Sequence, residues 1–234
     1  MIAPLNRADN LNEIYIGQLR FSQGRVGIVY TLAGGGPEGH LHDRYHKNVY
    51  YVSFSPRDLH FRAADGSDLG TSVDDAEQEA HLKIAETPLQ TVNPRSPDYI
   101  SLVGSTLGRQ PFVLWMQYDA AGLLHVNAGL WTGRAWVTRE VTTGARVRDM
   151  EPVGPFAWRV YTTVDGASGI GTALLVAGQW WAAESTIPTA KPVQRVEVIQ
   201  GYRDPARLLA TGASSARDVS IADGDVLVAG LECR

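Results

Sequence analysis

The chain has 234 residues, of which 44% are hydrophobic and 20% are charged, and its formal net charge is −4 at pH 7. This length allows one large all-β domain or two smaller domains with a substantial core, and the composition is ordinary for a soluble globular protein. Because there is no basic surplus, we do not expect nucleic acid as a partner. No run of about 20 apolar residues could span a membrane, so no membrane partner is expected either.

The chain contains a single cysteine, Cys233. An intramolecular disulfide is therefore excluded, and a cysteine-based metal site is not expected. Residues 1–10 lack the apolar core of a signal peptide. The sequence as given is expected to be cytoplasmic, or to be the mature or truncated part of an exported protein.

The N-terminal region predicts four antiparallel strands. Two runs of β-branched and aromatic residues, 14–21 and 25–32, flank a Ser-Gln-Gly turn and predict a β-hairpin. Two further runs, 48–54 and 59–63, are joined by a Ser-Pro-Arg-Asp turn, in which proline presets φ. These four strands are expected to form one compact sheet.

Residues 62–98 are less regular. A turn-rich stretch is followed by the acidic segment 74–85, which predicts either two helical turns or an acidic loop that ends in a strand. A connector with two prolines closes the region. The strand pattern then restarts in two further sets of four, at 99–105, 112–119, 123–131 and 135–141, and at 150–155, 157–165, 172–178 and 180–185.

These two sets share a repeated signature. The segment from Leu130 to Trp136 matches the segment from Leu175 to Trp181 at an offset of 45 residues, and both contain Gly-x-Ala/Trp-Trp after an apolar run. Four short strands every 40 to 50 residues, closing on a Gly-x-x-Trp turn, are typical of β-propeller blades. The recurrence of tryptophans at this spacing also predicts that most of them fill the core between blades.

We therefore predict an all-β fold, a single β-propeller-like domain over residues 1–234 built from four-stranded antiparallel blades. The blade-like units are expected at about 12–62, 98–142, 148–190 and 191–234. Four blades are few for a propeller. Three interpretations stay open, namely part of a larger chain, an unusually small propeller, or self-association in which a second copy completes the fold. A β-sandwich is the alternative fold.

The segment from Tyr30 to Phe61 is the richest in reactive side chains. It holds four of the six histidines of the chain, His40, His42, His46 and His60, together with Arg44, Tyr45 and Lys47. Most of these residues lie in a long loop between two predicted strands. Long loops on rigid scaffolds are where binding and catalysis concentrate, so we expect the site here.

Three segments carry a resemblance to a known family: residues 42–51 (H-D-R-Y-H-K-N-V-Y-Y), 61–70 (F-R-A-A-D-G-S-D-L-G) and 129–136 (G-L-W-T-G-R-A-W). Over roughly residues 12–182 the chain resembles the BNR-repeat (sialidase-repeat) propeller proteins of the polysaccharide-lyase kind, which include the ulvan lyases. The resemblance implies β-elimination on an acidic, uronate-containing polysaccharide or oligosaccharide. It also implies an extracellular or periplasmic location.

A lyase of this kind neutralises the uronate carboxylate, removes the C5 proton and protonates the leaving oxygen. Arg44 or Lys47 is a candidate for the first task, and His42 or His46 is a candidate for the second. Tyr45 is the candidate for the third. The candidates for substrate binding are Lys47, Tyr99, Tyr118 and Trp181.

Other hypotheses stay open. No cofactor is expected, although His40, His42 and His46 form a weak candidate site for a divalent metal, since residues two apart share one face of a strand. The first functional alternative is a non-catalytic carbohydrate-binding or interaction propeller whose loop is a solvated surface. The second is a sialidase-type glycoside hydrolase, although glycosidases usually need a pair of carboxylates and no spacing singles one out.

Overall fold

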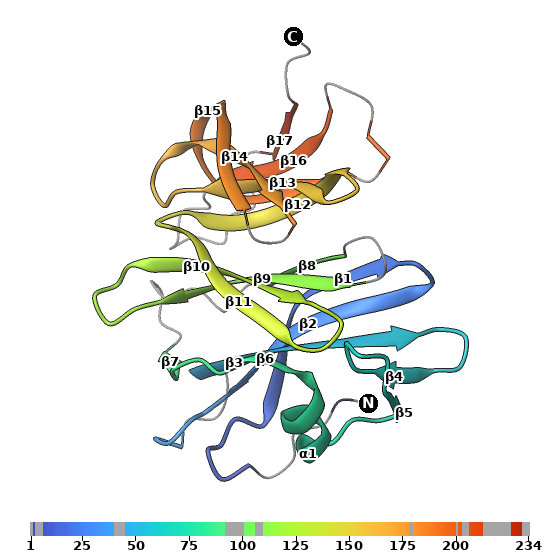
Figure 1. Cartoon of the computed structure of the whole chain (residues 1–234). Coiled ribbons are helices and arrows are strands. Elements are labelled where there is room, and N and C mark those ends of the chain that lie inside the picture. The colour runs from blue at the N-terminus through green and yellow to red at the C-terminus, as the bar shows by residue number, and fades with distance from the viewer. Residues whose placement is uncertain are drawn as a thin grey trace. The chain divides into compact units, whose positions relative to one another are not determined.

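The fold consists almost entirely of antiparallel β-sheets, as predicted (Figure 1). The structure, a computed structural model, describes residues 2, 7–39, 45–91, 101–105, 110–177, 180–199, 201–202, 206–212 and 226–230. The chain forms two compact units, Met1–Val141 and Thr142–Arg234. In the described ranges no helix is long and apolar enough to cross a membrane.

The first sheet contains the four predicted N-terminal strands and three short additions. Its main path is β1 (Glu13–Ser22), β2 (Arg25–Gly34), β3 (Tyr45–Ser55), β4 (His60–Arg62) and β5 (Asp68–Gly70). Two further strands, β6 (Lys83–Ala85) and β7 (Gln90–Thr91), pair with β3. Strand β3 is longer than predicted, because it begins at Tyr45 rather than at residue 48.

A bulge at Asn48 explains this difference. Asn48 has φ of 63°, a left-handed conformation that asparagine tolerates better than most residues. Its backbone N–H donates to Thr87 Oγ1 at 2.9 Å, and its side-chain oxygen accepts from the Thr87 N–H at 2.9 Å. This exchange ties the bulge to the segment between β6 and β7, so the strand continues through a residue that is usual in turns.

The acidic segment 74–85 combines both predicted alternatives. Asp74 and Glu77 form a capping box that starts the short helix α1 (Asp75–Glu77). One π-helical turn, Gln78–Leu82, follows and leads directly into β6. The helical segment is anchored to the first sheet because Glu79 accepts a hydrogen bond of 2.7 Å from the hydroxyl of Tyr50.

The second sheet has the order β11 (Trp136–Thr143), β10 (Leu124–Trp131), β9 (Pro111–Tyr118), β8 (Ser101–Ser105). All four strands were predicted. One apolar cluster joins this sheet to the first, and its buried members are Val29, Val49, Tyr51, Ile84, Val113 and Trp115. The two sheets of the first unit therefore share a core.

The second unit is one six-stranded antiparallel sheet. Its strands are β12 (Arg146–Gly154), β13 (Ala157–Thr163), β14 (Ser168–Val176), β15 (Trp180–Val198), β16 (Leu208–Gly212) and β17 (Val226–Ala229). Strand β15 pairs with β14 up to Pro192 and with β16 from Val193 onward. A single strand thus runs across the predicted boundary at residue 190.

The repeated sequence signature marks equivalent hairpins. Its first occurrence covers the end of β10 and the start of β11, and its second covers the end of β14 and the start of β15. Trp115 and Trp158 lie on the second strand of their sheets, and each is 3% exposed. Their predicted role in the core is confirmed, whereas Trp180 is 67% exposed.

These two environments give a stability prediction. We expect Trp158→Ala to destabilise the second unit by about 3–5 kcal/mol, because it removes a large buried side chain and leaves a cavity. The matched substitution Trp180→Ala should change stability by about 0.5 kcal/mol or less, because that ring is mostly in water. Chemical denaturation followed by far-UV circular dichroism measures both. Equal effects of the two substitutions would contradict this assignment.

Candidate functional site

The structure describes five of the predicted site residues. Tyr45, His46 and Lys47 begin β3, Tyr118 ends β9, and Trp181 lies near the start of β15. The others, His40, His42, Arg44 and Tyr99, lie outside the described residues. Their roles stay predictions.

Tyr45 belongs to the core of the first sheet. It is 8% exposed and packs in a cluster with Tyr30, Leu32 and Leu11. Gly36 has φ of 64°, and a Cβ atom there would collide with the Tyr45 ring. The ring is therefore held against the backbone of the β2–β3 loop. Its predicted role as the acid stays a prediction.

His46 lies on the opposite face of β3, because neighbouring strand residues point to opposite sides of a sheet. It is 1% exposed, and its ring meets the Tyr15 ring edge-on with centroids 5.1 Å apart. The structure therefore does not bring the predicted acid Tyr45 and the predicted base His46 together.

Gln90 draws the start of β3 and the end of β9 to one edge. It pairs with His46 in the β3–β7 register. Its side-chain amide donates to the Tyr118 carbonyl at 3.0 Å and accepts from the Tyr118 N–H at 3.3 Å. Gln90 thus links the strand that carries His46 to the backbone of Tyr118, and the predicted roles of both residues stay predictions. The sequence analysis did not identify Gln90 or Tyr15, which carry no motif.

Lys47 and Trp181 are half-buried strand residues. Lys47 lies opposite Leu32 on β2, and Trp181 lies opposite Leu175 on β14. The two belong to different units. Their predicted role in substrate binding stays a prediction.

A charged cluster lies on the β9–β10 hairpin and the adjoining strand. The His125 ring is 2.6 Å from a Glu140 oxygen through Nδ1 and 3.2 Å from an Asp119 oxygen through Nε2. These two carboxylates, Glu140 most strongly, raise the pKa of His125 above its usual value of 6.5. In the part of the chain that the structure describes, no group of three or more His, Cys, Asp or Glu side chains could hold a metal ion.

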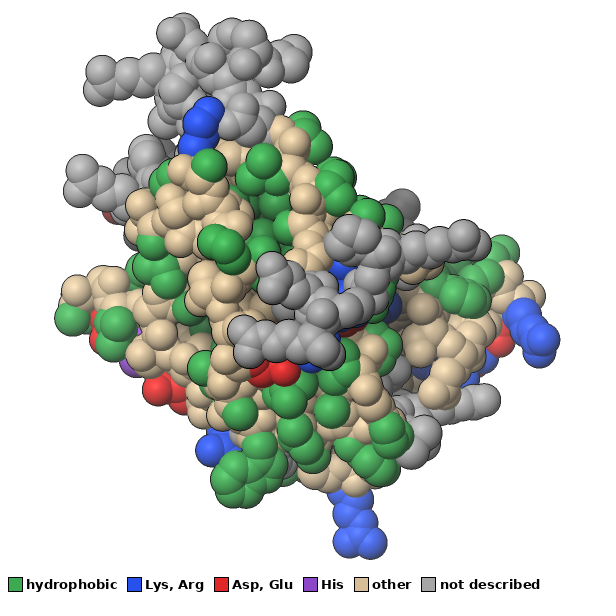
Figure 2. All heavy atoms as spheres, turned by 90° about the horizontal axis from the view of Figure 1, so that it is seen from above, with side chains coloured by type: hydrophobic (Ala, Val, Ile, Leu, Met, Phe, Trp, Pro, Cys, Tyr) green, Lys and Arg blue, Asp and Glu red, His purple; other side chains and the backbone are tan. Residues whose placement is uncertain are grey.

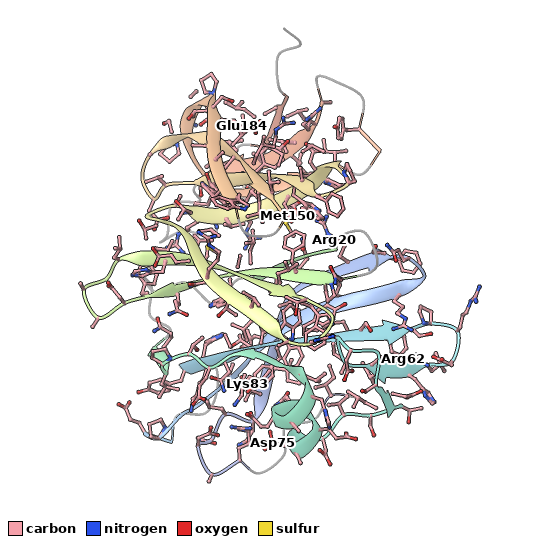
Figure 3. All side chains as sticks on the ribbon, in the orientation of Figure 1. Arg20, Arg62, Asp75, Lys83, Met150 and Glu184 are labelled. Carbon is pink, nitrogen blue, oxygen red and sulfur yellow. The ribbon has the colours of Figure 1, made fainter. Side chains whose placement is uncertain are left out.

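The second unit contains a tyrosine–glutamate–arginine cluster. The Tyr161 hydroxyl donates to Glu151 at 2.6 Å, and Arg207 lies 3.0 Å from the same oxygen. Arg159, on the same strand as Tyr161, forms an ion pair of 2.9 Å with Glu184, which is labelled in Figure 3. Some sialidases use a tyrosine nucleophile, but Tyr161 is fully buried. The cluster therefore stabilises the sheet rather than offering a reactive group to a substrate.

A cavity of about 400 Å³ opens between the two sheets of the first unit. It is lined by the β1–β2 hairpin, β3, the turn between β4 and β5, the start of β9 and the β10–β11 turn. Gly27 is paired with Arg20 on one side and with Ser53 on the other. Because glycine has no side chain, this position leaves open space between its two neighbours.

Two arginines line the cavity. Arg20 lies on β1 (Figure 3) and Arg25 on β2. Arg20 pairs with Gly27 and Arg25 with Ser22, so the arginines are diagonal neighbours on one face, with Cβ atoms roughly 7–8 Å apart. Among the described carboxylates, none forms an ion pair with Arg25. Its guanidinium is thus available to an anion.

Aromatic rings form the other wall. Tyr51 and Trp131 line the cavity, and Trp136 contacts both, with centroids 5.8 Å from Tyr51 and 5.7 Å from Trp131. Burial raises the pKa of Tyr51 to about 12, and the positive charge of Arg25 opposes that rise. Tyr51 is therefore a neutral phenol at pH 7.

Asp65 is the single carboxylate among the described residues that line the cavity. A hydrogen bond of 2.8 Å from the Ser67 N–H lowers its pKa and keeps it ionised. The described lining therefore offers no pair of carboxylates, which an ordinary glycosidase needs.

The sequence analysis did not find this cavity. Its polar and aromatic residues are spread from Arg20 to Trp131, and Trp131 was assigned with the other tryptophans to the core. The one available signal was the placement of Arg20, Ser22 and Arg25 around a tight hairpin turn, which puts polar side chains on one face.

Comparison with known proteins identifies the fold. No protein-family model and no curated protein matches the sequence. The fold is similar to that of an ulvan lyase of polysaccharide lyase family PL25 bound to -[GlcA(1-4)Rha3S]-, with a TM-score of 0.71 and 15% identity over 96% of this chain and 53% of that chain. A second structure of a PL25 ulvan lyase matches with a TM-score of 0.69 and 16% identity over the same shares. The chain thus has a polysaccharide lyase-like fold and spans about half the length of these lyases.

The His125 cluster gives a prediction for pH dependence. A raised pKa in the folded state means that the ion pairs stabilise the fold below about pH 6.5 and that this contribution is lost as pH rises through the folded-state pKa. Urea unfolding at several pH values should show that loss, and His125→Gln should remove it. NMR titration of the imidazole should give a pKa above 6.5. The same pH slope in wild type and variant would refute the assignment.

Proposed function

We propose that the chain is a polysaccharide lyase-like protein that binds an acidic, uronate-containing polysaccharide in the cavity between its first two sheets. We also propose that its sheets are blades of a β-propeller and that it cleaves the bound chain by β-elimination. Similarity of fold to two ulvan lyases supports the ligand class. The observation that carries the proposal is the joint presence of Arg20, Arg25, Tyr51 and Trp131 around one cavity.

These residue types suit an acidic sugar. A guanidinium binds a carboxylate through two parallel hydrogen bonds, which fixes both its position and its orientation. Trp131 offers an apolar ring face against which the C–H groups of a sugar ring can pack. Arg25 is the proposed partner of the uronate carboxylate, since its charge also acts on Tyr51.

Arg25 and Tyr51 account for the proposed chemistry. Arg25 withdraws charge from the carboxylate and so acidifies the neighbouring C5–H bond. Tyr51, as phenolate, takes the C5 proton. The C–H electron pair becomes the C4–C5 double bond, and the C4–O bond breaks. Tyr51 then returns the proton to the leaving oxygen, so the enzyme ends as it began.

Non-catalytic binding of the same polysaccharide is the second candidate function. The observation in its favour is that Tyr45 and His46 point to opposite faces of β3, so the predicted acid and base do not converge. Both functions require the arginines, and only cleavage requires the Tyr51 hydroxyl.

We expect Tyr51→Phe to abolish unsaturated product while leaving polysaccharide binding nearly unchanged. Arg25→Ala should weaken binding by about 10- to 100-fold, because it removes a charged hydrogen-bond donor. The ultraviolet absorbance of unsaturated uronate ends measures cleavage, and calorimetry with a panel of uronate-containing polysaccharides measures binding. Arg195→Ala, which removes an exposed arginine on β15 in the second unit, is the matched control.

The outcomes separate the two functions. Product that disappears in Tyr51→Phe supports the lyase. Binding without product in the wild type supports the binding protein and rejects cleavage. Binding that Arg25→Ala and Arg195→Ala weaken equally would remove the cavity from the proposal, and a further His42→Ala variant would then test the predicted loop.

The pH dependence provides an independent prediction. The pKa of Tyr51 is about 12. At pH values well below this, the ionised fraction of the tyrosine grows tenfold for each unit by which the pH rises. The cleavage rate at saturating substrate should therefore rise about tenfold per unit between about pH 7 and pH 9. A bell-shaped profile centred near neutral pH would exclude Tyr51 as the base.

A further inference from the structure

One face of the first sheet stays polar beyond the cavity. A row of paired residues crosses five strands of this face, and its members in strand order are Arg20, Gly27, Ser53, Arg62 and Asp68. Paired residues of antiparallel strands point to the same side. The cavity takes up the part of the row from β1 to β3. Neighbouring strands lie about 4.8 Å apart, so the row continues for roughly 10 Å past Ser53, through Arg62 (Figure 3) to Asp68.

The opposite face of these strands is apolar. Val26 pairs with Phe54, and Phe54 pairs with Phe61. Phe61 is a buried member of the cluster on that face, and the other two pack against it. Antiparallel strands that alternate in this way usually have their polar face open to solvent. On the face of the molecule drawn in Figure 2, apolar and uncharged groups cover most of the surface and charged side chains are few.

At the far end of the row, Asp68 orients the ring of His60. His60 Nδ1 lies 2.8 Å and 2.9 Å from the two carboxylate oxygens of Asp68. An ionised carboxylate only accepts hydrogen bonds, so Nδ1 carries the proton and Nε2 of the neutral ring is an acceptor. No described residue forms a hydrogen bond with Nε2, and the His60 side chain is 36% exposed. The ring therefore offers a fixed acceptor to a hydroxyl group.

The hairpin cluster, which consists of Asp58, His60, Arg62 and Asp68, carries no positive net charge. Arg62 forms ion pairs with both Asp58 and Asp68. Hydrogen bonds from Arg62 and from His60 lower the pKa values of Asp58 and Asp68 respectively, so both carboxylates are ionised at pH 7. Two carboxylates and one guanidinium give a net charge of −1 when His60 is neutral and zero when it is protonated.

The cavity has the opposite charge. Its described lining contains two arginines, Arg20 and Arg25, and one carboxylate, Asp65, which give a net charge of +1. A sugar unit with a carboxylate is therefore attracted to the cavity and not to the hairpin cluster. The two ends of the polar row suit different sugar units.

A polysaccharide must leave the cavity, because about 400 Å³ is the size of a site for a small molecule. Toward the centre of the sheets, the buried side chains of Val29, Val49 and Val113 close the space between them. The row over β4 and β5 leads away from this cluster and stays polar. It is thus a path along which the hydroxyl groups of a sugar chain can find partners.

We infer that a polysaccharide bound in the cavity continues across β4 and β5, where His60 accepts a hydrogen bond from a hydroxyl group of an uncharged sugar unit. This inference rests on the proposed function and narrows its substrate class. The cavity takes a uronate, and the hairpin cluster takes a unit without charge. The substrate is then a polysaccharide in which uronates are interspersed with uncharged sugars.

Chain length tests the second subsite. The probes are a disaccharide and an octasaccharide in which glucuronate alternates with uncharged N-acetylglucosamine, and calorimetry measures their binding. His60→Phe keeps a ring but removes the acceptor, so it should weaken octasaccharide binding about 3- to 10-fold and leave disaccharide binding unchanged. His125→Gln, which alters a histidine–carboxylate contact on β10 outside the row, is the matched control and should change neither. Far-UV circular dichroism confirms that the variants are folded.

The charge of the probe tests the order of the units. An octasaccharide of glucuronate alone should bind the wild type more weakly than the alternating one, because a carboxylate then meets the hairpin cluster. Asp58→Asn removes one negative charge there and should reduce the difference. Equal binding of the two octasaccharides by the wild type, or a difference that Asp58→Asn leaves unchanged, would overturn the inference.

The remaining outcomes separate this inference from the proposed function. Octasaccharide binding that depends on Arg25 but not on His60 rejects the second subsite alone. A loss in His60→Phe that is equal for both chain lengths also rejects it, because the effect then arises in the cavity. A wild type that binds no oligosaccharide, or binding that does not depend on Arg25, rejects the proposed function and the inference with it.

Discussion

The stacking of the first two sheets is the interaction on which the candidate site depends. Val29 and Val49 on one sheet pack against Val113 and Trp115 on the other, and all four are buried. Burial of apolar surface at about 25 cal/mol per Å² makes this contact the main source of stability between the sheets. The cavity lies next to this packed cluster. There Gly27 has no side chain to fill the space, and the lining contains Arg20 and Arg25. The apolar cluster and the cavity are therefore parts of one interface between the two sheets, and packing of the cluster fixes the geometry of the cavity.

Most of the fold could be predicted from the sequence because its strands are short, apolar and separated by turn residues. The repeat from Leu130 to Trp136 located equivalent hairpins in two sheets, since the same turn recurs where the same strands end. The start of β3 was missed for a physical reason. Asn48 is a turn residue by local preference, but two hydrogen bonds to Thr87, 39 positions away, stabilise its left-handed conformation inside a strand. No local pattern reports a contact of that separation.

The site was harder to predict than the strands. The many histidines and charged residues before β3 led us to predict the site in that loop. Tyr45 and His46, however, are neighbours in a strand, so their side chains point to opposite faces of the sheet. The cavity shows the opposite case, because Arg25, Tyr51 and Trp131 come from three separate strands and meet only through sheet stacking. A search by spacing detects groups that are close in sequence. Residues brought together by tertiary packing have no characteristic spacing in the sequence. The tryptophan repeat instead predicted that Trp131, like most of the tryptophans, lies in the core.

Burial of Tyr51 has two opposite consequences for the proposed reaction. The low polarity that raises its pKa to about 12 makes the phenolate scarce at neutral pH and also makes it a stronger base once formed. The charge of Arg25 acts against the first effect, because a positive neighbour stabilises the phenolate. When a uronate carboxylate binds to Arg25, it neutralises part of that help, so substrate binding itself should raise the pKa further.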